Sequence, residues 1–439
     1  MSEIVALLDC LVPSLAATNL GQLRRLLYAL LCIPGRVTTL GLSRWTEAGG
    51  SYRTLQRWYQ TPLDWAMVLW IMVRTHLLDP NGVYLLAGDE VVVSKAGKTT
   101  YGLGRFYSSL AQRPIPGLSF LVISLIDVRQ RRSYPLQVEQ RLPAASASPP
   151  SPPVPKRPRG RPKGSKNHAK ATPLLTPELT LLQRMLGAIL TRMAPLQMKH
   201  LVLDGFFGNY PATFVVQQAG LHLISKLRHN AALYLPYAGP KPRRGPTPRY
   251  GDKLDYRALP TEALRQTAIE GHYRIDTYQL TVLHRDFPDP LNVVILVKTD
   301  QRSGKRAHLI LFSTDLALAA AQIMDYYSLR FQIEFNFRDA KQYWGLEDFM
   351  NVSPTAVTNA ANLAFLMVNL SAVLLRPYRQ QHPDFSVGDL KTLFRARRYL
   401  QETINWLPDP PDPDLIPVLW RKFAALGAIR SRPLDRFAA

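Results

Sequence analysis

Residues 325–344 read DYYSLRFQIEFNFRDAKQYW. The stretch lacks proline and glycine and is rich in good helix formers, so we predict that it forms one continuous helix. Four of its polar side chains follow one another at spacings of three, four and seven positions: Tyr327, Arg330, Glu334 and Lys341. At about 100° per residue, these four side chains fall within about 60° of one another. One face of the helix therefore presents a phenol, two cations and a carboxylate.

Two interpretations of this face are open. It can be a solvated helix surface on which Arg330 and Glu334 form an ordinary ion pair four residues apart. It can also be a site for a divalent metal and a phosphodiester, because a carboxylate ligates the metal while Arg and Lys bind phosphate oxygens. On either interpretation Ile333, Phe337 and Ala340 lie on the opposite face, and we predict that they face a core.

The composition favours a polyanionic partner. The chain has 439 residues, with 54 Lys and Arg against 32 Asp and Glu, a formal net charge of +22 and a pI near 10.1. Such an excess of positive charge is typical of proteins that bind nucleic acid. A membrane surface is the weaker alternative, because no long basic amphipathic helix stands out. The length suffices for two or three domains.

Cysteine usage argues against a zinc site and a disulfide framework. The only cysteines are Cys10 and Cys32, no CxxC motif occurs, and we predict that both are buried free thiols. The N-terminus carries an early acid and no basic segment, so it does not resemble a secretory signal. The apolar run 363–375 is too short to span a bilayer. We therefore expect a soluble protein in a reducing compartment.

Residues 1–78 are predicted to be helical. Apolar residues recur at helical spacing in four segments: 20–31, 37–45, 52–59 and 63–77. The middle two are joined by a turn with two glycines, and Ser51 is a plausible N-cap for the second. This arrangement is compatible with a DNA-binding helix-turn-helix in which Arg53 and Arg57 reach bases or phosphates. An ordinary helical bundle is the alternative.

Residues 83–138 change to a strand pattern. The runs 83–93 and 118–128 are apolar and β-branched, which predicts buried strands, and 105–110 and 133–139 are candidates for two more. Asp89 lies inside the first run. A carboxylate there is costly unless it is paired, hydrogen-bonded or bound to metal, so Asp89 is a candidate functional residue. The alternative is a hydrogen-bonded Asp at a bulge.

Residues 142–177 interrupt this pattern with Ala, Ser and Pro followed by a basic run, which predicts a disordered insertion. Arg159-Gly160-Arg161-Pro162 within it resembles an AT-hook, a short extended segment that places two Arg in a narrow A·T minor groove. A solvated basic linker with nonspecific phosphate contacts is the alternative interpretation.

A second candidate acid follows the next predicted strand. Residues 199–204 form a short apolar run that ends in Asp204 and is followed by Gly205, and functional groups in open α/β sheets are often found at such strand ends. Residues 221–227 are predicted to be another strand, and 230–300 are rich in strand and turn signals. The basic loop 241–249 is a candidate DNA contact or a solvated hairpin tip. Residues 353–375 are predicted to be a long helix packed on the sheet.

These motifs together resemble a known family. The pattern Y-x2-R-x3-E-x6-K around Glu334 resembles the signature of DDE transposases of the IS4 type, and every interval matches. The family also has two acids upstream at strand ends, as Asp89 and Asp204 are predicted to be. Asp204, Gly205 and Phe207 are similar to the second catalytic motif of the family, although this match is looser. The resemblance covers roughly residues 83–375.

The resemblance implies a fold and a site. The expected fold class is α/β, with an RNase H-like catalytic core, a β-rich insertion and an all-α N-terminal domain. The implied catalytic and metal-binding residues are Asp89, Asp204 and Glu334, and the implied cofactor is Mg²⁺, for which Mn²⁺ can substitute. Tyr327, Arg330 and Lys341 would bind phosphates of double-stranded DNA.

The expected domain boundaries follow the same order. They are a helical DNA-binding domain at 1–78, core parts at 79–141, 178–229 and 301–376, the disordered insertion at 142–177, the β-rich insertion at 230–300 and a basic helical region at 377–439. The implied activity is cleavage at insertion-sequence ends and joining of the 3′-OH to target DNA. We expect a homodimer on DNA, no membrane association, and a cytoplasmic, nucleoid-associated location in a prokaryotic host. The alternatives are a noncatalytic DNA-binding protein derived from a transposase and an RNase H-fold nuclease.

Overall fold

The computed structural model describes residues 2–46, 49–108, 111–143, 172–194, 196–409 and 411–426. The AT-hook-like residues Arg159 and Arg161 lie outside these ranges, as does most of the predicted disordered insertion.

The N-terminal segment is helical, as predicted. Its helices are α1 (Ser2–Leu8), α2 (Ala17–Cys32), α3 (Thr39–Trp45), α4 (Tyr52–Tyr59) and α5 (Trp65–His76), with a 3₁₀ turn η1 (Asp9–Leu11) after the first. The prediction that Ser51 caps α4 is confirmed, because its hydroxyl accepts a hydrogen bond from the main-chain N–H of Thr54 at 3.4 Å. Cys32 is buried, as predicted, whereas Cys10 is only partly buried.

The central strands follow the predicted order along the chain. They are β1 (Tyr84–Ser94), β2 (Gly104–Ser108), β3 (Arg113–Asp127), β4 (Arg132–Arg141), β5 (His200–Leu203) and β6 (His222–Leu227). β3 pairs antiparallel with β1 and with β4, whereas β5 is parallel to β1 and β6 is parallel to β5. Three antiparallel strands followed by two strands parallel to the first, in the spatial order β4-β3-β1-β5-β6, form an RNase H-like core.

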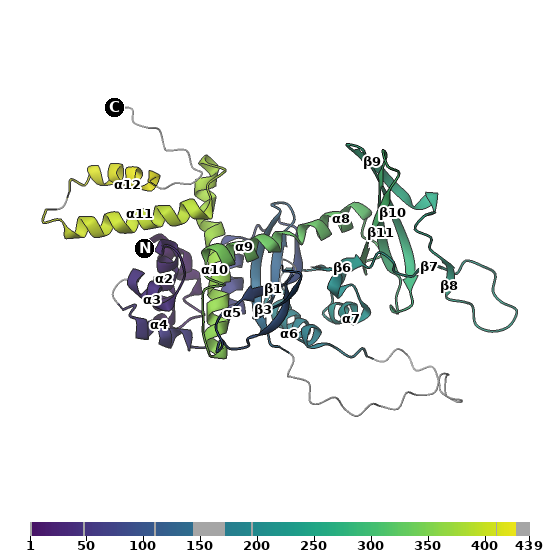
Figure 1. Cartoon of the computed structure of the whole chain (residues 1–439), viewed down its shortest axis with the longest axis horizontal. Helices are drawn as coiled ribbons and strands as arrows, with labels where there is room; N and C mark the ends of the chain where they lie inside the picture. The colour runs from purple at the N-terminus through teal and green to yellow at the C-terminus, as the bar shows by residue number, and fades with distance from the viewer. Residues whose placement is uncertain are drawn as a thin grey trace, which may run out of the picture.

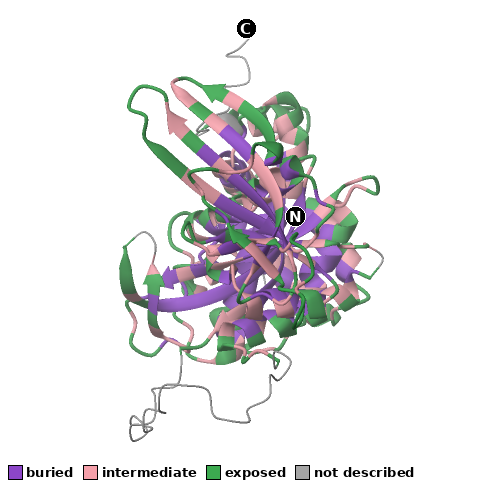
Figure 2. Cartoon of the chain, turned by 90° about the vertical axis from the view of Figure 1, so that its right-hand side faces the viewer, coloured by how far each residue is buried: buried purple, intermediate pink, exposed green. Residues whose placement is uncertain are grey.

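The β-rich part continues the same sheet. It comprises β7 (Leu233–Pro236), β8 (Tyr250–Lys253), a 3₁₀ turn η3 (Thr261–Ala263), β9 (Leu264–Glu270), β10 (Tyr273–His284), β11 (Leu291–Asp300) and β12 (Arg306–Ser313). β12 pairs with β6 on one side and with β11 on the other, so the sheet runs without a break from the core into the β-rich part (Figure 1). Figure 2 shows that buried residues run through the centre of the molecule, whereas the outer strands carry many exposed residues.

The remaining helices include those that cover both faces of the core sheet. They are α6 (Pro177–Arg192), α7 (Tyr210–Gln218), α8 (Ala320–Leu329), α9 (Gln332–Tyr343), α10 (Pro354–Gln381), α11 (Val387–Trp406) and α12 (Leu415–Ala425), with a 3₁₀ turn η2 (Gly205–Phe207) before α7. Alternate residues of β1 belong to two different hydrophobic clusters: Leu85 and Ala87 pack with α9 and α10, whereas Leu86 packs with α6 and α7.

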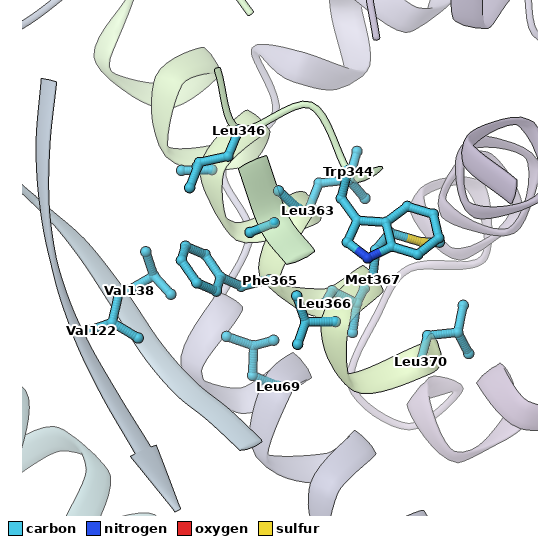
Figure 3. Packing of buried hydrophobic residues seen from close by; sticks show 14 of the residues in the cluster. Leu69, Val122, Val138, Trp344, Leu346, Leu363, Phe365, Leu366, Met367 and Leu370 are labelled. Carbon is cyan, nitrogen blue, oxygen red and sulfur yellow. The ribbon is translucent and has the colours of Figure 1, made fainter. Parts of the chain in front are cut away.

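Helix α10 is the central helix of the molecule, and it packs on the sheet as predicted. Its Asn362 and Asn369 side chains donate to the main-chain carbonyls of Val138 (3.2 Å) and Pro135 (2.8 Å) in β4. Figure 3 shows Phe365 of this helix facing Val138. Among the described residues, α10 is the one helix long and apolar enough to cross a membrane. Since most of it is buried inside the molecule, it has the character of a core helix.

The prediction of one continuous helix over residues 325–344 was wrong. Two helices occupy the stretch: α8 begins earlier, at Ala320, and ends at Leu329, and α9 begins at Gln332. At the junction the main-chain N–H groups of Arg330 and Phe331 bond three residues back rather than four, at 3.3 and 3.2 Å. Such 3₁₀ bonding changes the rotation per residue, so the helical projection does not hold across the junction.

Candidate active site

Strand pairing brings the two predicted aspartates together. β1 and β5 are parallel neighbours, and their register pairs Gly88 with Leu203. Asp89 and Asp204 each follow one of these paired residues, so they lie side by side where adjacent strands, about 4.8 Å apart, carry them. A side chain at Gly88 would collide with Leu203, because an added Cβ would lie 2.7 Å from its Cδ2 atom. The glycine therefore leaves room for the side chain of Leu203.

Both acids face the same side of the sheet as α9. Three residues of β1 have side chains on the same face as Asp89: Leu85, Ala87 and Val91. They pack in the hydrophobic cluster that contains α9 and α10. Asp204 shares the alternation of Val202, which packs in the same cluster. Since side chains alternate along a strand, both carboxylates are directed toward that helical layer.

Main-chain bonds fix the orientation of each aspartate. One oxygen of Asp89 accepts from the N–H of Glu90 at 2.8 Å. One oxygen of Asp204 accepts from the N–H of Phe206 at 3.1 Å, so this acid caps the 3₁₀ turn η2. The carbonyl of Asp204 accepts from the hydroxyl of Ser225 at 2.7 Å, which ties it to β6. The second oxygen of each carboxylate is left for other partners.

Arg330 lies among the carboxylates. Its guanidinium forms an ion pair with Asp89, and another of its nitrogens lies 3.5 Å from an oxygen of Glu334. The side chains of Arg330 and Asp89 are each only 17% exposed, whereas that of Glu334 is 44% exposed. The Nε atom of Arg330 is buried without a hydrogen-bond partner. The α8–α9 junction therefore joins Asp89 to the first turn of α9, which carries Glu334.

The protonation behaviour of Asp89 reflects this environment. Burial raises the pKa of its carboxyl from the usual 3.8 to about 6, against the opposing effect of Arg330. The negative charges of Asp204 and Glu334 contribute to this rise, so the three acids are close enough to repel one another. Perturbed carboxylates of this kind are common at functional sites.

Tyr327 belongs to the same group. Burial raises the pKa of its phenol, while Arg330 lowers it through its charge and a side-chain hydrogen bond. The charges of Asp204 and Asp89 also act on this phenol. The structure therefore brings together five of the predicted site residues: Asp89, Asp204, Tyr327, Arg330 and Glu334.

Lys341 has different neighbours. Its ammonium group donates to the main-chain carbonyl of Val92 at 2.8 Å and lies 3.6 Å from a carboxylate oxygen of Glu347. It therefore joins α9 to β1 beyond Asp89, rather than lining up with Arg330. Ile333, Phe337 and Ala340 are all buried, as predicted.

Sequence reasoning missed Asn336, which positions α9. This buried side chain donates to the hydroxyl of Ser133 in β4 at 2.8 Å. Asn336 lies two residues after Glu334. Its bond to Ser133 therefore holds the start of α9 at a fixed distance from the sheet. An Asn among apolar residues on the inner face of a helix was a possible signal, because a buried amide requires a partner.

Arg53 and Arg57, the predicted contacts of the N-terminal helices, lie elsewhere. Both are exposed on α4 and line a cavity of about 1080 Å³ between α3, α4 and residues 344–352. Asp89, Asp204 and Glu334 do not line it. The structure thus places these two arginines at a second location, on the far side of the segment that follows α9.

The described residues contain no group of three or more His, Cys, Asp or Glu side chains arranged to hold a metal ion. The chemistry of the site nevertheless suits one. Carboxylates are the oxygen donors that divalent cations of the Mg²⁺ type prefer. Burial and, to a smaller extent, the charges of Asp204 and Glu334 raise the pKa of Asp89. The guanidinium of Arg330 supplies the positive charge beside Asp89.

A family model described as "DDE superfamily endonuclease" matches residues 10–284, which is well over half of the chain. The chain belongs to this family. The part of the DDE endonuclease that matches includes Asp89 and Asp204 and ends before Glu334. No curated protein sequence matches the chain. Among solved structures, it is similar to the piggyBac transposase in a synaptic complex with hairpin DNA, with a TM-score of 0.39 and 12% sequence identity over 96% of this chain and 84% of that chain.

Proposed function

We propose that this DDE endonuclease is a transposase of the IS4 type, which cuts DNA at the ends of an insertion sequence and joins the freed 3′-OH to target DNA. The observation that carries the proposal is the gathering of Asp89 and Asp204 on adjacent strands beneath the α8–α9 junction, with Arg330 linking Asp89 to Glu334. The spacing of Tyr327, Arg330, Glu334 and Lys341 supports assignment to the IS4 type.

We assign the metal-binding role to Asp89, Asp204 and Glu334. Divalent cations, Mg²⁺ or Mn²⁺, would supply charge neutralisation at the phosphodiester and acidify a bound water. The main-chain bonds to Asp89 and Asp204 keep both carboxylates in place before DNA arrives, which lowers the cost of reorganisation. The bond between Asn336 and Ser133 does the same for the first turn of α9.

Cationic and phenolic groups around these acids suit the DNA backbone. In this proposal Arg330 and Tyr327 bind phosphate oxygens beside the cleaved bond, and Lys341 binds a phosphate further along α9. The unpaired Nε of Arg330 is a donor that a phosphate oxygen would satisfy. Arg53 and Arg57 on α4, and Arg159 and Arg161 of the AT-hook-like segment, would add contacts to double-stranded DNA.

The chain would act as a homodimer on paired DNA ends, in the cytoplasm of a prokaryotic host. In this proposal the segments 79–141, 178–229 and 301–376 form the catalytic core, and 1–78 bind end DNA. The net charge of the whole chain, +22, supports a DNA partner.

A cleavage and strand-transfer assay tests the proposal. Purified protein is incubated with DNA that flanks its gene and with a target plasmid, in Mg²⁺ or Mn²⁺. We expect metal-dependent cleavage and joining by the wild type, and a loss of at least about 10³-fold in Asp89→Ala, Asp204→Ala and Glu334→Ala, with DNA binding retained. Glu262→Ala removes an exposed carboxylate in η3 and serves as the matched control, which should remain active.

The other outcomes distinguish the alternatives. Full cleavage by any one of the three variants would refute the site assignment. Cleavage without joining would indicate an RNase H-fold nuclease. Binding of DNA without cleavage, under conditions in which a known transposase works, would indicate a noncatalytic DNA-binding protein.

A further inference from the structure

The cavity between α4 and residues 344–352 has an organised chemistry of its own. Its volume of about 1080 Å³ lies at the upper end of the range for small-molecule pockets. One wall is the exposed stripe of α4, and the other is the segment that leads from α9 to α10. Its lining includes none of the three acids of the candidate active site.

Hydrogen bonds fix the segment between α9 and α10 against the N-terminal part of the chain. The hydroxyl of Ser353 donates to the side chain of Gln60 at 2.7 Å, and the main-chain N–H of Val37 donates to Asp348 at 2.8 Å. The ammonium group of Lys95 lies behind the second wall. It is buried and donates to the carbonyls of residues 347 and 349 at 2.9 and 2.8 Å. The cavity is therefore preformed.

Positive charge dominates this cavity. Arg53 and Arg57 are exposed on α4, and the side chain of Arg36 is 72% exposed at the edge. Asp348 is the one acid among the described lining residues, and its carboxylate is already bonded to the N–H of Val37 and paired with Arg36 at 3.3 Å. The free charge at the site is thus cationic, which suits phosphate groups.

The cavity also presents apolar and amide surface. Tyr52 is 42% exposed, Met350 44% and Val352 62%, so an aromatic ring and two apolar side chains face the opening. Gln56 and Asn351 also line the cavity. Their amide nitrogens donate to the Tyr52 hydroxyl at 2.9 Å and to the carbonyl of Ala356 at 3.0 Å. A cationic groove with aromatic or apolar surfaces and a few amides is the chemistry that binds unpaired nucleic acid, because base faces stack and base edges bond.

The geometry also favours a single strand over a duplex. A recognition helix enters the major groove with its flanks clear. The exposed side chains of α4, in contrast, face a wall formed by residues 344–352. Exposed Met350 and Val352 have no role against the sugar–phosphate surface of a duplex, whereas they can pack against bases that are not paired.

We propose that this cavity binds an unpaired DNA strand of a few nucleotides, with phosphates on Arg53 and Arg57 and bases against Tyr52, Met350 and Val352. The inference rests on the proposed function, in which DNA ends are cut, and it names the form of DNA that these arginines contact. The strand lies against the segment that follows α9.

Fluorescence anisotropy tests the proposal with the full-length protein in EDTA, so that cleavage does not contribute. The probes are a labelled oligo(dT) eight-mer and a labelled blunt duplex. Val352→Glu places a negative charge in the cavity without disturbing the core, and Ile269→Glu, at an equally exposed apolar site on β9, is the matched control. We expect Val352→Glu to weaken oligo(dT) binding about tenfold and Ile269→Glu to change it less than about twofold.

Tyr52→Ala and Arg57→Ala give independent readouts. Loss of the stacking ring should weaken oligo(dT) binding by about fivefold or more. Loss of one phosphate contact should reduce the salt dependence of log K by about 0.7. Wild-type affinity for oligo(dT) in Val352→Glu, or weakening confined to the duplex, would overturn the inference. Duplex binding without oligo(dT) binding by the wild type would overturn the inference alone, whereas no DNA binding at all would overturn the proposed function with it.

Discussion

Replacement of Asp89 by Asn removes a negative charge that the surroundings of this side chain disfavour. In the folded protein burial, together with the negative charges of Asp204 and Glu334, raises the pKa of this carboxyl from 3.8 to about 6. The folded state therefore binds the proton of Asp89 more tightly than the unfolded chain does. As a result, the free energy of unfolding falls as the pH rises from about 4 through 6.

The size of this effect follows from the same pKa. A rise to about 6 corresponds to about 3 kcal/mol of destabilisation once the carboxyl is fully ionised in both states. About half of that loss is already present at pH 5, so roughly 1.5 kcal/mol remains between pH 5 and pH 8. The amide that replaces the carboxyl carries no charge at any pH. We therefore expect the stability of Asp89→Asn relative to the wild type to be about 1.5 kcal/mol greater at pH 8 than at pH 5.

Urea unfolding at pH 5, 6, 7 and 8 in EDTA measures this difference. Glu262→Gln is the matched control, because it makes the same chemical change at an exposed carboxylate in η3. Added Mn²⁺ should stabilise the wild type at pH 8 and leave Asp89→Asn nearly unchanged, since a ligand that binds only the folded state raises its stability. A margin for Asp89→Asn that is constant or shrinks toward pH 8 would refute the reasoning.

Three further predictions concern other contacts. Arg330→Gln should bind Mn²⁺ about tenfold more tightly in the absence of DNA, because the guanidinium competes for Asp89; isothermal titration measures this, and weaker binding would contradict it. Asn359→Leu should lower the free energy of unfolding by about 3 kcal/mol or more. The change leaves a buried indole N–H and two main-chain carbonyls without hydrogen-bond partners, and urea unfolding measures the loss. Gly345→Ala should cost at least about 1–2 kcal/mol, since φ is +77° and a Cβ would lie 2.4 Å from Val37; an unchanged melting temperature would exclude this.

Local patterns in the sequence were sufficient to predict much of the fold. Apolar runs with β-branched residues identified the strands around Asp89 and Asp204, because buried parallel strands have that composition. The register that places these two aspartates side by side needed the pairing of β1 with β5, across more than a hundred residues. The family resemblance thus predicted that the site residues come together. The local sequence could not predict the strand register that places them.

The errors have equally physical causes. The break between α8 and α9 contains Arg330 and Phe331, which are neither helix breakers nor turn residues, so no sequence signal marked it. Arg330 in this break forms a tertiary ion pair with Asp89, and the main chain there bonds three residues back. The contact of Lys341 with the carbonyl of Val92 is likewise tertiary, and no periodicity could predict it.

The position of α10 has a consequence for synthesis of the chain. Asn359 in this helix bonds to the carbonyl of Tyr59, which is 300 positions earlier in the sequence. At about 5–20 residues per second, a ribosome needs about 15–60 s to make the intervening chain. For that time the inner surfaces of the first helices lack the partner that buries them. Nascent chains should therefore depend on chaperones until α10 emerges, and the delay should make overproduced protein prone to aggregation.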